Sequence, residues 1–101
     1  MEKPEPAKSK PRFEHGRFLM TPGAAEVMRR CDTKPSVLLD RHLCGDWGVV
    51  DADDAKANER ALNPKDPLRI LSAYKLTPDD TLWIITERDR SVTTILKPDE
   101  Y

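Results

Sequence analysis

The chain of 101 residues is short of most features that mark a specialised class of protein. Two cysteines, Cys31 and Cys44, are too few for a secreted disulfide scaffold, so we expect both to be reduced thiols in the core. No apolar run approaches the ~20 residues of a membrane span, and no hydrophobic signal segment precedes the cysteines. We therefore expect a cytoplasmic protein with no membrane contact, built as one domain.

An excess of charge of one sign is also missing. The formal net charge is −1 and the isoelectric point is about 6.1. Domains that coat nucleic acid usually have an isoelectric point above ~9, so the balance argues against that class while leaving room for a small basic site.

The loops and ligand spacings of cofactor enzymes are absent too. The chain contains no GxxxxGK, GxGxxG or nucleophile-elbow motif, and neither CxxC nor HExxH. His42 and Cys44 are two residues apart on a predicted helix and so point in different directions. The acidic cluster at 51–54 lacks the glycine and the distal glutamate of a calcium loop. We therefore expect no cofactor and no metal.

What the chain does contain begins with a tail rich in Lys, Glu and Pro over residues 1–12, which we predict to be disordered. Residues 13–101 form the predicted domain. Thr21 and Pro22 predict a helix start, Pro35 a second helix that ends near Gly45, and Asp51 a third helix.

The last third of the chain changes to strand patterns at 68–76, 81–86 and 92–96. The middle strand is apolar on both faces, which is typical of a central strand. Because the connections are short, we predict an antiparallel meander. The fold class is then α+β, with about three helices followed by a three-stranded antiparallel sheet. The short apolar stretch at 17–20 is interpreted as an edge strand or a lead-in to the core.

Two segments concentrate groups that could carry chemistry. In the first, 41–48, His42 could act as a general acid or base. The alternative interpretation makes Asp46 a local cap, Trp47 a core plug and His42 a half-exposed side chain.

The second segment, 86–94, holds two arginines, two acids and four hydroxyl groups. Arg88 or Arg90, with Thr93 or Thr94, could hold a phosphate and stabilise its charge during transfer. The alternative is a surface hairpin with arginine–acid pairs and threonines that suit a strand.

The motifs GDWG, LSAY and WIITERDRSVTTILKPDEY, spread over residues 18–101, resemble a family of small bacterial proteins of plasmids and integrating elements. The resemblance implies an accessory role on a mobile element. Some of these proteins carry a label linking them to the modification subunit of type I restriction enzymes. A chain without a glycine-containing methyl-donor loop cannot be that subunit, although a small accessory or inhibitor of such a system remains conceivable.

A second, architectural similarity is to the ribonuclease superfamily that includes barnase, EndoU, colicin-type tRNases and RelE toxins. It implies His42 as acid–base group, Arg88 or Arg90 as the stabiliser of phosphate charge, and Thr93 or Thr94 as its hydrogen-bond donor. Tyr74 would stack on a base.

Three hypotheses follow. The first is a non-enzymatic module that binds a protein or nucleic-acid partner through Trp47, Tyr74 or Trp83, whichever is exposed. The second is a metal-independent ribonuclease that uses His42, Arg88, Arg90 and Thr94 in one cleft. The third is a structural homodimer with the sheet or its edge at the two-fold axis.

Overall fold

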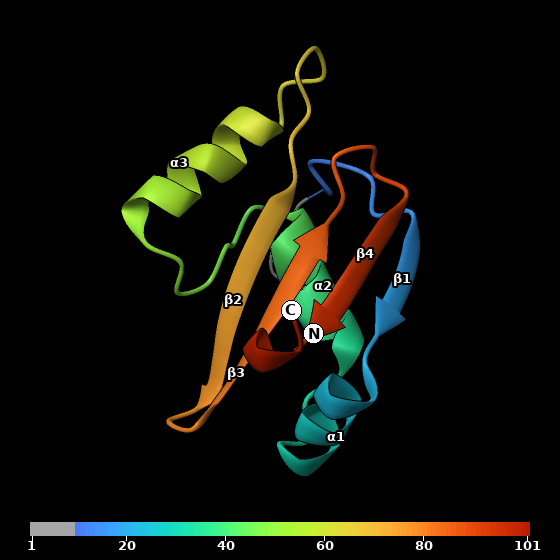
Figure 1. Cartoon of the computed structure of the whole chain (residues 1–101), viewed down its shortest axis with the longest axis vertical. Helices are drawn as coiled ribbons and strands as arrows, with labels where there is room; N and C mark the ends of the chain where they lie inside the picture. Colours follow the sequence, from blue (N-terminus) through green and yellow to red (C-terminus); the bar gives the residue numbers. More distant parts are fainter. Residues whose placement is uncertain (1–9) are drawn as a thin grey trace, which may run out of the picture.

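The computed structural model describes residues 10–101 (Figure 1). Its elements in chain order are β1 (Arg17–Met20), α1 (Pro22–Arg30), α2 (Pro35–Leu43), α3 (Ala52–Ala61), β2 (Ile70–Thr77), β3 (Asp80–Thr86), β4 (Val92–Leu96) and the short 3-10 helix η1 (Pro98–Glu100). Within these residues no helix has the length and apolar character needed to cross a membrane.

Most of the tail predicted for residues 1–12, namely residues 1–9, lies outside the described residues. Its last residue, however, belongs to the fold. The backbone N–H of Arg12 donates to the carbonyl of Leu43 at 2.8 Å, and its guanidinium forms an ion pair with Glu59 at 2.7 Å. Arg12 is therefore bonded to α2 and α3, although it belongs to the segment predicted as a tail.

The helices begin where local chemistry predicts. The Thr21 hydroxyl accepts a hydrogen bond from the Ala24 N–H at 3.1 Å, and proline follows it in the first turn of α1. Asp51 caps α3 by accepting from the Asp54 N–H at 2.8 Å. Beyond α2, Gly45 has a φ of 91°, a left-handed conformation that suits glycine and turns the chain away from the helix axis.

The sheet corrects the prediction of a three-stranded antiparallel meander. It has four strands in the order β1-β4-β3-β2, and it is mixed. β2, β3 and β4 are antiparallel as expected, while β1 pairs with β4 in parallel, from Arg17 opposite Val92 to Met20 opposite Ile95. The all-antiparallel prediction was wrong because a parallel pair joins segments distant in sequence, and no local pattern records such a pairing.

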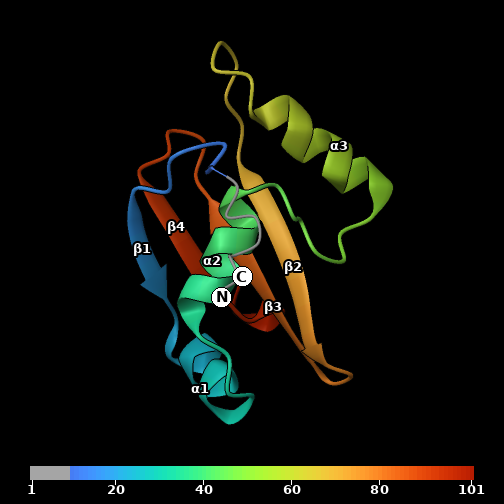
Figure 2. The same cartoon turned by 180° about the vertical axis from the view of Figure 1, so that it is seen from behind.

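α1 and α2 pack on one face of this sheet, which we call the inner face; Figure 2 shows α2 in front of it. The main core lies between them and consists of Ala24, Val27, Met28, Leu38, Tyr74, Leu82, Ile84 and Ile95. The opposite face, the outer face, points to the viewer in Figure 1, and among residues 10–101 only η1 crosses it, at one end. α3 lies beside β2 rather than over either face.

The free edge of β2 is closed by hydrogen bonds from outside the sheet. The Asn58 side chain on α3 donates to the Leu71 carbonyl at 2.7 Å and accepts from the Leu71 N–H at 3.1 Å. One pair further on, the carbonyl of Ala73 accepts from Val49 at 2.7 Å, and its N–H donates to Trp47 at 3.0 Å. Over residues 71–73 this edge is therefore closed to another strand.

We expect Asn58→Ala to lower the free energy of unfolding by about 2–4 kcal/mol, because it leaves the backbone N–H and C=O of Leu71 without partners at a buried site. Asn63→Ala is the matched control, since Asn63 is exposed and its side chain only accepts a bond from the Lys65 N–H. Its cost should stay below about 1 kcal/mol. Urea unfolding measures both, and equal losses would contradict the capping role of Asn58.

Candidate functional site

The segments 41–48 and 86–94 meet in the structure, but their contact lies in the core. The His42 ring from α2 lies against the inner face of the sheet and is 0% exposed. Its Nδ1 is 2.6 Å from the Ser72 hydroxyl on β2, and its Nε2 is 2.9 Å from the Thr86 hydroxyl on β3. Both hydroxyl partners are buried with it.

The hydrogen bonds continue from β3 into β4. The Thr86 hydroxyl is 2.7 Å from the Thr93 hydroxyl, and Thr93 donates to the carbonyl of His15 at 2.8 Å. A carbonyl can only accept, so Thr93 must receive its second bond from Thr86. Thr86 must then accept from Nε2–H of His42, and the Nδ1 of the neutral ring accepts from Ser72. One proton arrangement thus satisfies all four bonds.

Burial of the ring, aided by the positive charge of Arg90, lowers the pKa of His42 to about 3. The ring is therefore neutral at physiological pH and sealed from solvent. A general acid or base must reach its substrate, and this imidazole touches only protein. The arrangement suits a structural cross-link between α2 and three strands.

Arg90 is likewise occupied inside the protein. Its Nη2 donates to the carbonyl of Ala61, the last residue of α3, at 2.7 Å, and its Nη1 donates to the Leu68 carbonyl at 2.7 Å. The guanidinium also lies 5.6 Å from the centre of the Phe13 ring. A cation at the carboxyl end of a helix is favourable, so Arg90 joins the β3–β4 turn to α3 rather than presenting charge to a phosphate.

The other residues of the ribonuclease hypothesis do not form a common site with His42. Arg88 is exposed in the β3–β4 turn. Thr94 stands opposite Ile85 and Leu19, on the outer face, while Thr93 and His42 lie on the inner side. His42 and Thr94 are thus on opposite sides of the sheet and share no cleft.

Of the three aromatic residues predicted as partner anchors, two are buried and one is accessible. Trp47 is 7% exposed and Tyr74 is 1% exposed, so neither can contact a partner. The indole N–H of Trp47 donates to Glu59 at 3.1 Å, and the hydroxyl of Tyr74 donates to the Asp46 carbonyl at 2.6 Å. Only Trp83 is accessible, half-buried on the outer face.

That outer face is the unusual surface of the molecule. The register places apolar side chains from all four strands on it, together with Thr81 and Thr94: Leu19, Leu71, Ala73, Trp83, Ile85, Val92 and Leu96. Among these, Ala73, Ile85 and Leu96 are buried, Leu71, Trp83 and Val92 are half-buried, and Leu19 is exposed. In an antiparallel sheet with helices on one face, the other face is commonly polar. The sequence carries the signal in 82–85, where both alternating sets of side chains are apolar, but it does not show that one set is left without a covering helix.

The segment that follows β4 folds back over one end of the outer face. The Tyr101 ring meets the Trp83 ring edge to face, with 5.8 Å between their centres. Arg69 donates to the Tyr101 hydroxyl and lies 5.6 Å from the centre of its ring. Tyr101 itself is 71% exposed. We call Arg69, Trp83 and Tyr101 the aromatic cluster; sequence analysis identified only Trp83.

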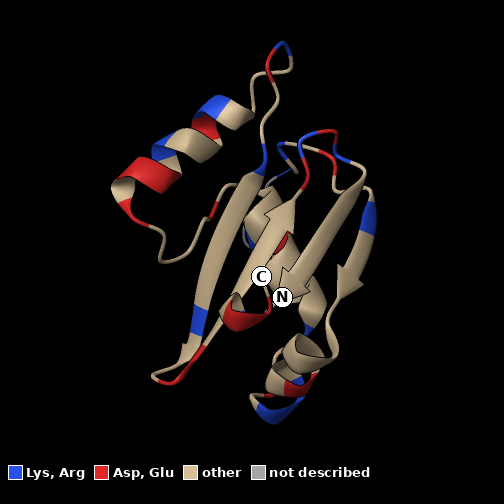
Figure 3. Cartoon of the chain, viewed as in Figure 1, with Lys and Arg blue, Asp and Glu red and all other residues tan. Residues whose placement is uncertain are grey.

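Charges surround the apolar part of this face. Figure 3 shows an uncharged sheet centre with cationic positions on the outer strands and acidic positions in η1. The cations are Arg17 on β1, and Arg69 and Lys75 at the two ends of β2. The surface is therefore apolar in the middle and basic along both sides.

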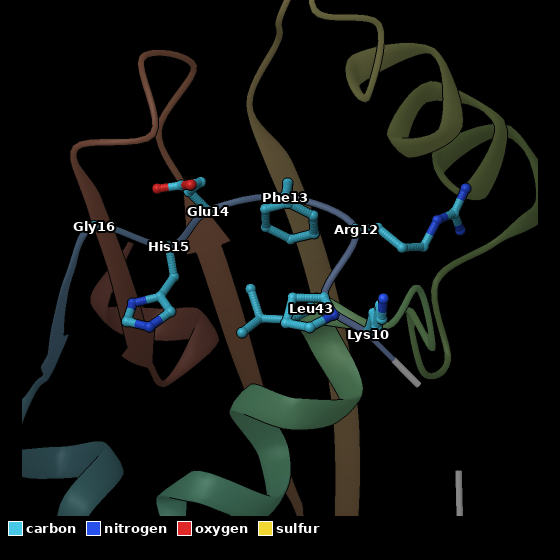
Figure 4. A pocket seen from close by; sticks show the side chains of 8 residues that line it. Lys10, Arg12, Phe13, Glu14, His15, Gly16 and Leu43 are labelled. Carbon is cyan, nitrogen blue, oxygen red and sulfur yellow. The ribbon is translucent and has the colours of Figure 1, made fainter. Parts of the chain in front are cut away.

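A hollow of about 820 Å³ lies on another part of the molecule (Figure 4). Its lining is a single stretch of chain, residues 10–16, with Leu43 beneath it. The Phe13 ring packs on His42 and Trp47, so this wall extends a smaller core formed by Trp47, Ala61 and Ile70. Among residues 10–101, no three His, Cys, Asp or Glu side chains are grouped so as to hold a metal ion.

The buried neutral His42 predicts a defined pH dependence of stability. Its pKa is about 3 in the folded chain and about 6.5 when unfolded, so only the unfolded state binds a proton between these values. The contribution is full above pH ~6.5 and is lost by about 1.4 kcal/mol per pH unit as the pH falls toward 3. We expect His42→Gln to be less stable than wild type at pH 7.5, with the difference shrinking at that rate below pH ~6. Urea unfolding at pH 7.5, 5.5 and 4.5 measures it; a constant difference would contradict the neutral buried ring.

Comparison of the chain with protein-family models, with curated proteins and with solved structures gave no match. The resemblance to plasmid-borne proteins therefore stays an expectation from the motifs. What the chain can do has to be argued from its surface.

Proposed function

We propose that the protein is a non-enzymatic accessory module that binds a protein partner on the outer face of its sheet. The observation that carries the proposal is the accessible aromatic cluster on the outer face, beside the half-buried apolar side chains of Leu71 and Val92. Among residues 10–101, α1, α2 and α3 leave this face uncovered and η1 crosses one end of it. Contiguous exposed apolar patches on soluble proteins commonly mark interaction sites. The mobile-element setting comes from the motif resemblance alone.

The aromatic cluster supplies the anchor of this site. Tryptophan, tyrosine and arginine are the residue types that dominate binding energy at protein interfaces, and Arg69, Trp83 and Tyr101 lie in mutual contact. Because Tyr101 is largely exposed, a partner can cover its ring without unfolding any element.

The charges indicate the chemistry of the partner. Arg17 on one side of the face and Arg69 and Lys75 on the other frame the apolar centre. Such a surface is complementary to a segment with apolar side chains in the middle and carboxylates at its flanks. An amphipathic, acidic peptide segment fits this description.

Nucleic acid is the weaker alternative for the same surface. An exposed sheet with aromatic side chains can stack bases, but affinity for RNA depends on neutralising phosphates. Here three cations frame a largely aliphatic centre, and the chain as a whole is slightly acidic. The ribonuclease hypothesis gains no support, since His42 is enclosed and Thr94 lies on the far side of the sheet.

The proposal is tested by selecting peptides from a random display library on the wild-type protein. We expect enrichment of sequences that combine apolar and acidic residues. Binding of the selected peptides should weaken at least about tenfold in Arg69→Glu and in Tyr101→Ala, because both remove parts of the aromatic cluster. Fluorescence anisotropy of labelled peptides measures the affinity.

Arg29→Glu is the matched control, since it reverses an exposed arginine on α1, the helix that packs on the inner face. It should leave peptide affinity within about twofold of wild type. Peptides that bind Arg69→Glu as tightly as wild type, or whose NMR shift changes map to α1 and α2, would overturn the proposal. So would a labelled single-stranded RNA that binds more tightly than any selected peptide and is released by Tyr101→Ala.

A further inference from the structure

The free edge of β1 is open, in contrast to the part of the β2 edge at residues 71–73. Arg17 donates to the Ser91 carbonyl at 2.9 Å and Thr21 to the Ile95 carbonyl at 3.0 Å, so the odd-numbered residues of β1 direct their backbone groups at β4. The N–H and C=O groups of Phe18 and Met20 therefore point away from the sheet. In Figures 1 and 2, β1 is the outermost strand on its side.

Soluble proteins usually protect such an edge with a very short strand, charged side chains, a proline, a bulge or a covering element. β1 has four residues and a single charge, Arg17, at its start. The strand reads RFLM and contains no proline, and its register with β4 runs without a bulge. Leu19 is 42% exposed beside the open backbone groups, and Met20 is exposed as well. The edge is thus able to pair with a further strand.

We propose that this edge pairs with β1 of a second copy of the chain, antiparallel about a two-fold axis through Leu19. Phe18 of one copy then faces Met20 of the other, and these pairs exchange four backbone hydrogen bonds through the outward-pointing groups. Leu19 faces Leu19 of the second copy as a non-hydrogen-bonded pair, where side chains lie closest.

Charge complementarity selects the second copy as the occupant. In this register Arg17 lies opposite Thr21 of the second copy, on the outer face. The Thr21 hydroxyl donates to the Glu100 carboxylate at 2.6 Å, so Glu100 stands where the incoming guanidinium arrives. Within residues 10–101 of a single chain, Arg17 forms no ion pair. The two-fold axis provides two Arg17–Glu100 pairs.

The neighbouring registers are less favourable. Shifting the strands so that Phe18 faces Phe18 makes the two Arg17 side chains diagonal neighbours, which places like charges within reach of each other. Shifting them the other way brings Pro22, which has no N–H to donate, opposite Phe18. The register centred on Leu19 avoids both conflicts.

This assembly is independent of the proposed partner site and adds to it. Two four-stranded sheets become one continuous sheet, and the two outer faces lie side by side with Leu19 between them. With only two short strands in contact, the dimer should be weak, with a dissociation constant of about 10–100 μM.

Sedimentation equilibrium of the full chain, from about 5 μM to about 1 mM, tests the pairing against the 11.5 kDa mass of one chain. We expect a reversible monomer–dimer equilibrium. Leu19→Lys should raise the dissociation constant at least about tenfold, because it sets two ammonium groups face to face on the axis. Val37→Lys is the control, since Val37 is an equally exposed apolar residue on α2, and it should leave the constant unchanged.

A charge exchange tests the register. Arg17→Glu and Glu100→Lys should each raise the dissociation constant about tenfold, and the double variant should return it to within about threefold of wild type. A chain that stays monomeric throughout, a dimer insensitive to Leu19→Lys, or a double variant no better than the single ones would overturn the proposal. Peptide binding by the wild-type chain at about 1 μM, where the weak dimer is not populated, is independent of these results, so failure here is distinguishable from failure of the proposed function.

Discussion

The buried imidazole of His42 is the contact on which the arrangement of the layers depends. It ties α2 to β2 through Ser72 and to β3 through Thr86, and the chain of hydroxyls reaches β4 and the carbonyl of His15 just before β1. A fully satisfied polar network in a core imposes one geometry, because any slip of helix against sheet leaves a buried group unpaired. The helix layer is thereby aligned with all four strands.

Several residues that look catalytic in the sequence have a structural role instead. Histidine, threonine, serine and arginine can form directional bonds inside a small core, and Arg90 uses its donors on the carbonyls of Ala61 and Leu68. A ribonuclease site would require the same residue types. Composition therefore cannot distinguish a structural polar network from a ribonuclease site. The two are distinguished by the exposure of the groups and by the side of the sheet on which they lie.

Features set by neighbouring residues could be predicted from the sequence, whereas pairings between segments far apart in the chain could not. Caps at Thr21 and Asp51 and the strand patterns of the last third gave the helices and three strands with small boundary errors. The stretch at 17–20 was predicted as an edge strand or a lead-in, and it is an edge strand. Its pairing with β4, Arg17 opposite Val92, left no local trace, so the predicted sheet had three strands. For the same reason Trp47 and Trp83 looked alike as anchors, although one is buried and the other lies on an uncovered face.

The parallel pairing of β1 with β4 also has a kinetic meaning. Its partners are 75 residues apart, so closing this pair carries the largest loop entropy of any contact in the sheet. During synthesis β1 leaves the ribosome early and must wait for β4, while the hairpin of β2 and β3 can form as soon as it emerges. β1 is thus the last of the four strands to be secured, and until then its apolar residues lack their place in the sheet.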